Sequence, residues 1–394
     1  MGCLAVCALL AVLVALAFAR LAPPTLRNVT LAYGRSVLER IGVVDPLQGN
    51  ASESDLGFAG HLLTEDQQDV YLQLLVGVRS LKESFAITNT RPEDIDPTFR
   101  AIVRDHPELF WIDGSCVYTY ASLGDVMNIE PGFTLPLDQV ESVRQRIEAE
   151  AGLFLAGVPA DASEYDKARA AYEYVIAETD YSTNAAQNQN IQSVFLAHES
   201  VCAGYARAYQ YLLQRMGMEC AYVEGSIVDA DEDHAWNLVR IDGSYTYVDP
   251  TWGDPTYQAE VDPAVLAATR GIIYDYLCLT TEEILRDRHV FDSPADWPAC
   301  EDASLDWYRR EGSFFESYDE QALANVFWRK VDEGASMVAY KFANDESFRA
   351  ASDALEVGSF LRDDLLDLAG QRGLDSFRYS YSTSDTLRIV RIYW

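Results

Sequence analysis

The segment from residue 200 to residue 252 constrains the fold most strongly, because a helical pattern and three strand-like runs follow one another there. Small and apolar side chains recur at helical spacing through 202–213. The runs 219–227, 234–241 and 244–252 are rich in β-branched and aromatic residues. Asp242-Gly243 separates the last two runs and favours a two-residue turn. This order predicts a helix packed on an antiparallel sheet.

The predicted turn fixes which side chains face each other across the hairpin. Ile241 and Ser244 are the expected pair beside it. That register places Asp249 opposite Trp236. His234 lies two residues before Trp236 on the same face, so His234 and Asp249 become diagonal neighbours roughly 7 Å apart, which long side chains bridge. The sequence therefore predicts an imidazole held by a carboxylate.

Cys202 stands where the predicted helix begins. Unpaired N–H groups and the positive end of the helix dipole favour a thiolate there, the reactive form of cysteine. Alone, Cys202 would be interpreted as a buried, unreactive residue, because free cysteines are among the most buried residues. Together with His234 and Asp249, it supplies the thiolate, imidazole and carboxylate that nucleophilic acyl transfer requires.

The stretches SVCAGYARAYQYLLQRMGMECAYVEG (200–225) and HAWNLVRIDGSYTYVDPTWGD (234–254) resemble the transglutaminase-like superfamily. Members of that superfamily have a papain-like fold with a cysteine at a helix start, then His-Ala-Trp, then Asp-x-Thr. The resemblance covers about residues 165–255 and implies that Cys202, His234 and Asp249 form a catalytic triad. It also implies an exported bacterial enzyme, a protease or protein-glutamine acyltransferase that acts on protein or peptide amides.

The same resemblance implies an oxyanion site near the cysteine. One donor would be the Cys202 backbone N–H, and the second is often an upstream side chain. Tyr181, Gln189 and Asn190 are the candidates for it, and Trp236 is a candidate for lining the cleft. Ser200 stands where many members have glycine. No calcium-loop pattern is present and the acidic run 229–233 is interpreted as a solvated loop, so we expect neither a cofactor nor a metal.

The order of helical and strand-like patterns predicts an α+β protein with helices packed on an antiparallel sheet, and the resemblance implies that this core is papain-like. The expected parts are a linker at 20–60, an α+β region at 61–135, the catalytic core at 136–300 and a small α/β domain at 301–394. Helical patterns occur at 70–81 and 92–107, and a hairpin is expected around Asp113-Gly114. Two long helices are expected from residues 137 and 163, the second capped by Ser163.

The apolar run 3–19 ends in Ala17-Phe18-Ala19 and predicts a signal peptide. An uncleaved membrane anchor is the alternative, because no Lys or Arg precedes the run. The expected location is therefore extracellular or at the cell surface. Cys278 and Cys300 could pair in a disulfide there, and a fully reduced set of thiols is an equal alternative.

Two hypotheses from different classes remain. A formal net charge of -32 argues against a nucleic-acid partner, because binding phosphate backbones requires clusters of Lys and Arg. The first hypothesis is a cysteine-dependent enzyme that acts on a protein or peptide substrate. The second is a catalytically inactive scaffold or peptide-binding module, because much of the chain lies outside the motif region.

Overall fold

The computed structural model describes residues 47, 49–121, 126–228, 230, 232–254, 272–291, 297–373 and 379–394. It divides into two compact units, one within 1–148 and one within 149–394, which are described separately. In the described ranges, no helix is both long and apolar enough to span a bilayer. The apolar run 3–19 and residues 20–46 of the expected linker lie outside those ranges. The domain boundaries expected from the sequence stay predictions.

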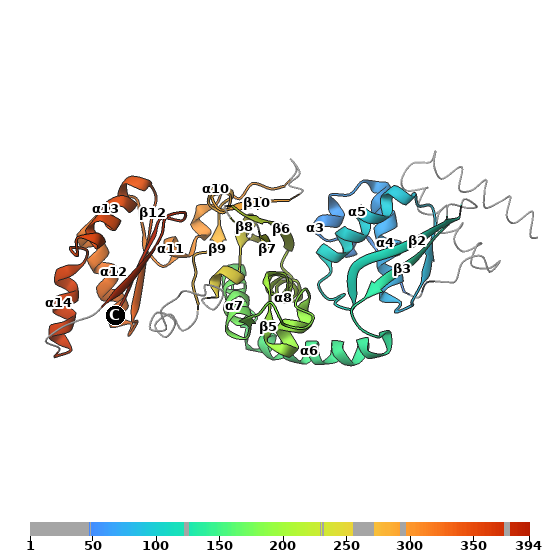
Figure 1. The fold of residues 1–394 in the computed structure, drawn as a ribbon, viewed down its shortest axis with the longest axis horizontal. Helices are drawn as coiled ribbons and strands as arrows, with labels where there is room; N and C mark the ends of the chain where they lie inside the picture. The colour runs from blue at the N-terminus through green and yellow to red at the C-terminus, as the bar shows by residue number, and fades with distance from the viewer. Residues whose placement is uncertain are drawn as a thin grey trace, which may run out of the picture. The chain divides into compact units, whose positions relative to one another are not determined.

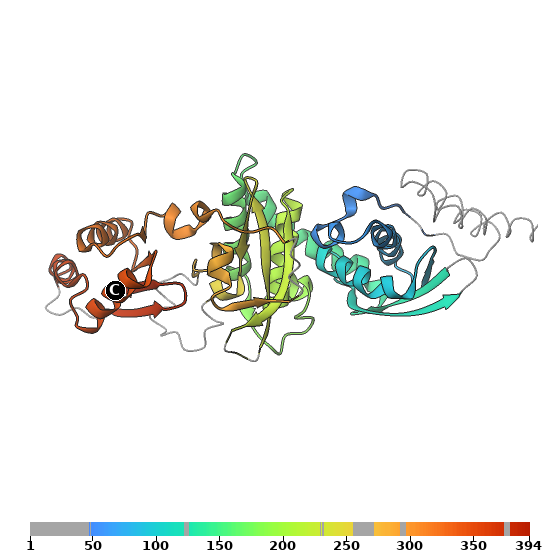
Figure 2. The ribbon, with the colours of Figure 1, turned by 90° about the horizontal axis from the view of Figure 1, so that it is seen from above.

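The first unit is a small α+β layer built on a three-stranded antiparallel sheet (Figure 2). Helices α4 and α5 pack against this sheet, and their inward faces supply buried side chains such as Leu74, Ile95 and Phe99. The helical patterns predicted at 70–81 and 92–107 are thereby confirmed. The elements are η1 (Glu53–Asp55), α3 (Phe58–His61), α4 (Glu65–Arg79), β1 (Phe85–Ile87), α5 (Pro92–Asp105), β2 (Ile112–Ala121), β3 (Val126–Phe133) and η2 (Leu137–Gln139).

The hairpin predicted around Asp113-Gly114 is wrong. Residues Ile112–Ala121 form one strand, β2, which pairs antiparallel with β3. Gly114 has a φ of 87°, and the register shifts between Ile112 and Cys116, so the dipeptide forms a bulge inside the strand. The N–H of Ser115 donates to Asp113 Oδ1 at 2.8 Å, which satisfies the local backbone without a chain reversal.

The second unit begins with helices and continues into an antiparallel sheet of order β10-β6-β7-β8-β9 (Figure 1). Helix α8 packs on β6 and β7, and α7 packs on α8. Ser163 caps α7 as predicted, because its Oγ accepts from the Asp166 N–H at 3.1 Å. The elements are α6 (Val140–Gly157), which begins in the first unit, α7 (Glu164–Ala177), β4 (Asp180–Tyr181), η3 (Ser193–Ala197), β5 (Glu199–Ser200), α8 (Cys202–Arg215), β6 (Cys220–Ile227), β7 (Asp233–Ile241), β8 (Ser244–Val248), η4 (Thr251–Gly253), β9 (Leu277–Leu279), α10 (Thr281–Ile284) and β10 (Arg288–Val290).

The hairpin between β7 and β8 has the predicted register. Ile241 pairs with Ser244, and Asn237 pairs with Val248 at the other end. Asp242 and Gly243 have φ values of 50° and 88°, the backbone that a two-residue turn of this type requires. Asp249 directly follows β8. If this register is extended by one residue, Asp249 lies opposite Trp236, two residues from His234.

The C-terminal part of the second unit is a four-stranded sheet of order β11-β12-β14-β13, covered by helices α12, α13 and α14. The helix, strand, helix and closing pair of strands predicted here are present, and α13 is an additional helix. The elements are η5 (Ala303–Leu305), α11 (Trp307–Arg310), β11 (Phe314–Phe315), α12 (Glu320–Asp332), β12 (Met337–Phe342), α13 (Asp345–Glu356), α14 (Arg362–Gln371), β13 (Ser380–Ser384) and β14 (Ile389–Tyr393).

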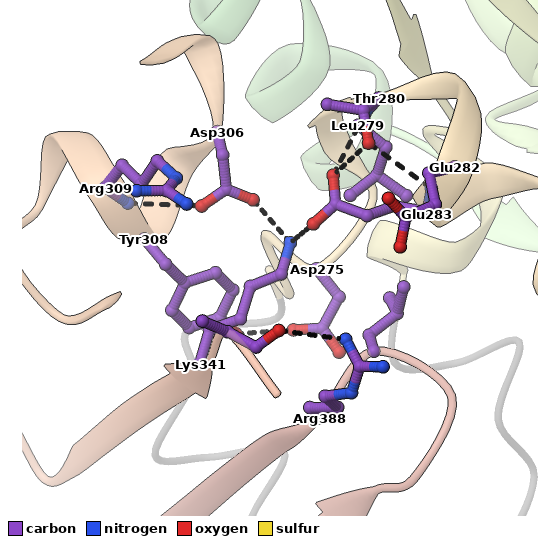
Figure 3. A network of polar contacts seen from close by, with 12 residues as sticks. Asp275, Leu279, Thr280, Glu282, Glu283, Asp306, Tyr308, Arg309, Lys341 and Arg388 are labelled. Atoms are coloured by element: carbon purple, nitrogen blue, oxygen red, sulfur yellow. Dashed lines mark hydrogen bonds and ion pairs between the residues drawn. The ribbon is translucent and has the colours of Figure 1, made fainter. Parts of the chain in front are cut away.

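Buried ion pairs connect this C-terminal sheet to the segment that carries β9 and α10. The Lys341 ammonium on β12 lies 2.5 Å from Asp306 Oδ2 and 2.7 Å from Glu283 Oε1 (Figure 3). Arg391 on β14 pairs with Asp275, which also accepts from the Tyr308 hydroxyl at 2.6 Å. These ion pairs hold β12 and β14 of the C-terminal sheet against residues 275–306, which follow the β7–β8 hairpin in the sequence.

Candidate active site

Cys202 is the first residue of α8 and is partly exposed. Val201 precedes it in an extended conformation, with no side-chain hydrogen bond to the helix. The N–H groups of Gly204 and Tyr205 donate to the Val201 carbonyl, and the N–H groups of Cys202 and Ala203 before them have no acceptor within the helix. The cysteine packs against buried Ala206, Tyr222 and Ala235, so its thiol lies at the edge of the core rather than within it.

A pair of buried serines fixes the chain that leads into α8. The Ser193 and Ser200 hydroxyl oxygens are 2.7 Å apart, and Ser200 donates to the Asn188 carbonyl at 3.2 Å. A Cβ atom on Gly204 would lie 1.9 Å from Ser200 Oγ, so only glycine allows this approach. Ser200 thus forms part of the packing beneath the first turn of α8.

His234 joins the cysteine to a carboxylate. Its Nε2 lies 2.7 Å from Asp249 Oδ2, which leaves Nδ1 as the nitrogen that can face the thiol, and a hydrogen bond links the imidazole with Cys202. Its ring stacks on that of Trp236 at 5.8 Å between centroids. Burial lowers the pKa of His234, but Asp249 and Cys202 outweigh burial and raise the pKa to about 9.

The Asp249 carboxylate is fully buried and has four hydrogen-bond donors. Oδ1 accepts from the N–H groups of Thr251 at 3.1 Å and Trp252 at 3.4 Å. Oδ2 accepts from His234 and from the Arg288 guanidinium, whose Nη2 is 2.9 Å away. Burial alone would raise the pKa of this carboxyl, but the charges of His234 and Arg288 hold it below the ordinary value.

Sequence reasoning missed Arg288. It enters the site from β10, 39 residues after Asp249, and residues 255–271 intervene, so no turn or spacing rule connects the two positions. Its side chain is fully buried. A buried arginine needs an anion, but the burial of Arg288 is evident only in the structure, so the sequence offered no signal for this contact.

The structure brings together Cys202, His234 and Asp249, with Trp236 stacked on His234. Tyr181 pairs with Ser200 in a short parallel ladder, and its ring lies 6.4 Å from that of Tyr205 on α8. The Gln189 side chain is exposed and donates to Asn188. The Asn190 amide donates to Gln187, and its oxygen accepts from the Gln192 N–H. Trp236 is fully buried against His234. Their roles at an oxyanion site stay predictions.

No group of three or more His, Cys, Asp or Glu side chains is arranged to hold a metal in the part of the chain that the structure describes. Asp229 and Asp231 of the acidic run lie outside that part. His198 is exposed and hydrogen-bonds the Glu178 carbonyl. Cys278 and Cys300 are both buried free thiols.

The segment that carries this site is similar in sequence to a known protein family. Residues 156–250 match the sequence model of the Transglutaminase-like superfamily. Kyphoscoliosis peptidase of Mus musculus is 26% identical to this chain over 106 residues, which cover 23% of this chain and 16% of the relative. The Homo sapiens protein of the same name matches with the same identity and coverage. The chain therefore spans 16% of the length of these relatives.

Among solved structures, a crystal structure titled as that of a TGase matches 35% of this chain and 44% of its own length. The identity is 14% and the TM-score is 0.26.

Proposed function

Because residues 156–250 belong to the transglutaminase-like superfamily, we propose that this chain is an exported cysteine-dependent enzyme that cleaves or transfers protein and peptide amides. The observation that carries the proposal is the contact series from Cys202 to His234 to Asp249. A scaffold that only binds peptides does not require a buried ion pair behind a partly exposed thiol. The triad is therefore assigned to Cys202 as nucleophile, His234 as acid and base, and Asp249 as the group that orients the imidazole.

The first half of the reaction forms a thioester. The Cys202 sulfur attacks the carbonyl carbon of an amide, and the helix-start N–H groups of α8 stabilise the negative oxygen that develops. The C–N bond then breaks as the His234 imidazolium gives its proton to the departing nitrogen. Asp249 holds Nε2 throughout, so the Nδ1 side of the ring stays directed at the sulfur.

The second half regenerates the thiolate. Water or a primary amine gives a proton to the neutral His234 imidazole and adds to the thioester carbon, and the C–S bond breaks. Water makes the chain a hydrolase, and an amine makes it an acyltransferase. The relatives named peptidase support peptide-bond hydrolysis as the outcome for this chain. Export rests on the apolar run 3–19.

The test separates the two outcomes in one sample. The purified chain is incubated with a protein mixture and a tagged primary amine, and mass spectrometry reads new peptide termini and incorporated tag. We expect new termini with wild-type protein and none with Cys202→Ala. Tag without new termini would identify an acyltransferase instead.

Cys220→Ala is the matched control, because Cys220 is a buried free thiol in the same helix-and-sheet layer. It is expected to retain the wild-type products. If wild type and Cys202→Ala give the same products, or neither gives any, the proposed enzyme is rejected in favour of the scaffold.

A further inference from the structure

One oxygen atom of the candidate site is shared by two cations. Asp249 Oδ2 accepts from His234 Nε2 at 2.7 Å and from Arg288 Nη2 at 2.9 Å. The two donors therefore lie within roughly 4–6 Å of each other, the range in which one charge alters the titration of another. Each cation weakens the hold of the carboxylate on the other.

Arg288 is fixed in place on its other sides. Its guanidinium carbon lies 4.3 Å from the ring centroid of Trp252 and 4.8 Å from that of Tyr276. Its Nη1 lies 2.9 Å from Asp287 Oδ1, and the other oxygen of Asp287 accepts from the Tyr276 hydroxyl. Two aromatic faces and two carboxylates thus hold one planar cation, an arrangement that suits guanidinium better than ammonium.

The Asp249 carboxylate does not depend on Arg288 for its orientation. Two backbone N–H groups hold Oδ1, and the Asp249 N–H donates to the Tyr276 carbonyl at 3.0 Å. Removal of Arg288 would therefore leave the carboxylate beside His234. What would disappear is a positive charge close to the imidazole, so the role of Arg288 is mainly electrostatic.

We propose that Arg288 is a positioning residue of the site: by sharing Asp249 Oδ2 with His234, it weakens the stabilisation that the carboxylate gives to the imidazolium. In the proposed function, on which this inference rests, the imidazolium must release its Nδ1 proton to a departing amine, while its Nε2 proton stays with Asp249. An aspartate with no second cation would stabilise the imidazolium more strongly and slow that release. Among the residues that the structure describes, the titratable and charged groups near the imidazole include Cys202, Asp249, Asp287 and Arg288.

The test measures the imidazole itself, so it does not require a substrate. The full chain is labelled with ¹⁵N-histidine, and the ring nitrogen shifts of His234 are followed between about pH 6 and pH 11. The spectrum of His234→Gln identifies its signals among the five histidines. In Arg288→Gln, we expect the pKa of His234 to rise by about one unit, because a like charge has been removed.

Two further variants make the result specific. Arg288→Lys keeps a positive charge and is expected to leave the pKa of His234 close to the wild-type value. If Arg288→Gln does not fold, Arg288→Lys is compared with wild type in its place, and a changed pKa of His234 in this variant, which keeps the positive charge, contradicts charge sharing. Lys341→Met removes another buried cation, whose partners are Asp306 and Glu283, and is expected to leave His234 unchanged.

An unchanged or lowered pKa of His234 in folded Arg288→Gln would overturn the inference. This outcome is distinguishable from failure of the proposed function. The nitrogen shifts report charge sharing even in a chain that cleaves nothing, whereas the product assay with Cys202→Ala reports catalysis alone.

Discussion

His234 links the charge of the candidate site to the stability of the fold. Its pKa in the folded chain is about 9, above the ordinary 6.5, because Asp249 and Cys202 outweigh burial. The folded state therefore binds this proton more tightly than the unfolded state does. The resulting stabilisation is complete below pH 6.5 and disappears as the pH rises through about 9.

The comparison of wild type with His234→Gln isolates this contribution. Glutamine cannot titrate, so the difference in unfolding free energy should be largest near about pH 6 and smallest near about pH 10. Urea unfolding at several pH values measures the difference. A difference that stays constant over this range would show that the imidazole is not held by a carboxylate.

Asp249→Asn should damage both chemistry and stability. The amide cannot hold the imidazolium or neutralise Arg288, so activity should fall roughly 10⁴-fold, as when a triad aspartate is replaced. The unfolding free energy should fall by about 3–5 kcal/mol, because the buried guanidinium and the buried imidazole lose the carboxylate that they share.

Asp306→Asn is the matched control, since Asp306 is also buried and paired with a cation. It should lose stability while each folded molecule keeps its activity. Equal activity per folded molecule in the two variants would contradict the role assigned to Asp249.

The start of α8 depends on the absence of a side chain at Gly204. A Cβ there would lie 1.9 Å from Ser200 Oγ and 3.0 Å from the Asn188 carbonyl, which is backbone and cannot rotate away. Gly204→Ala should therefore move the first turn of α8 and cost about 1–3 kcal/mol of unfolding free energy. Because Cys202 lies in that turn, activity per folded molecule should also fall.

Gly152→Ala in α6 provides the contrast, because a Cβ at that position meets nothing within 4 Å. Alanine favours a helix over glycine, so this variant should be neutral or more stable by about 1 kcal/mol. Thermal melting and the product assay measure both variants. If Gly204→Ala behaves like Gly152→Ala, the tight packing beneath α8 is absent.

The elements differ in how far local sequence determines them. Asp242-Gly243 fixes the β7–β8 register through a short turn, so the meeting of His234 and Asp249 is predictable from sequence. Asp113-Gly114 has the same residue types, yet it forms a bulge because β3 pairs with β2 on both sides of the dipeptide. The local sequence pattern does not show which strand will pair with this segment. Arg288 is not predictable for the same reason, because its partner Asp249 lies 39 residues away in the sequence.

Helix α13 was open to prediction and was missed. Asn344 accepts from the Ser347 N–H at 2.9 Å as its cap, and Phe348, Ala351 and Leu355 recur at helical spacing on the buried face. Both signals are visible in the sequence. The ion pairs between distant segments, by contrast, follow from tertiary packing and have no local signature.

The C-terminal sheet and the candidate site belong to one stable unit because buried charges connect them. Lys341 is 1% exposed and neutralises Asp306 and Glu283, which lie on the segment between β9 and β11 (Figure 3). Lys341→Met would leave both carboxylates without this cation. We expect the unfolding free energy to fall by about 3–5 kcal/mol.

The triple variant Lys341→Met, Glu283→Gln, Asp306→Asn removes the carboxylate charges as well. It should recover part of the lost stability, because no unpaired charge remains buried. Urea unfolding compares the variants. Unchanged stability in Lys341→Met alone would mean that these groups are solvated rather than paired.

The central claim is that the His234 imidazole, held by Asp249, contacts the Cys202 sulfur and makes it the nucleophile. Its most direct test is the rate at which iodoacetamide alkylates Cys202, read peptide by peptide by mass spectrometry at about pH 6, well below the ordinary thiol pKa of about 8.5. We predict that Cys202 reacts there while the other thiols do not, and that His234→Gln abolishes the reaction. Alkylation of Cys202 that sets in only near about pH 8.5, equally in both proteins, would contradict the account.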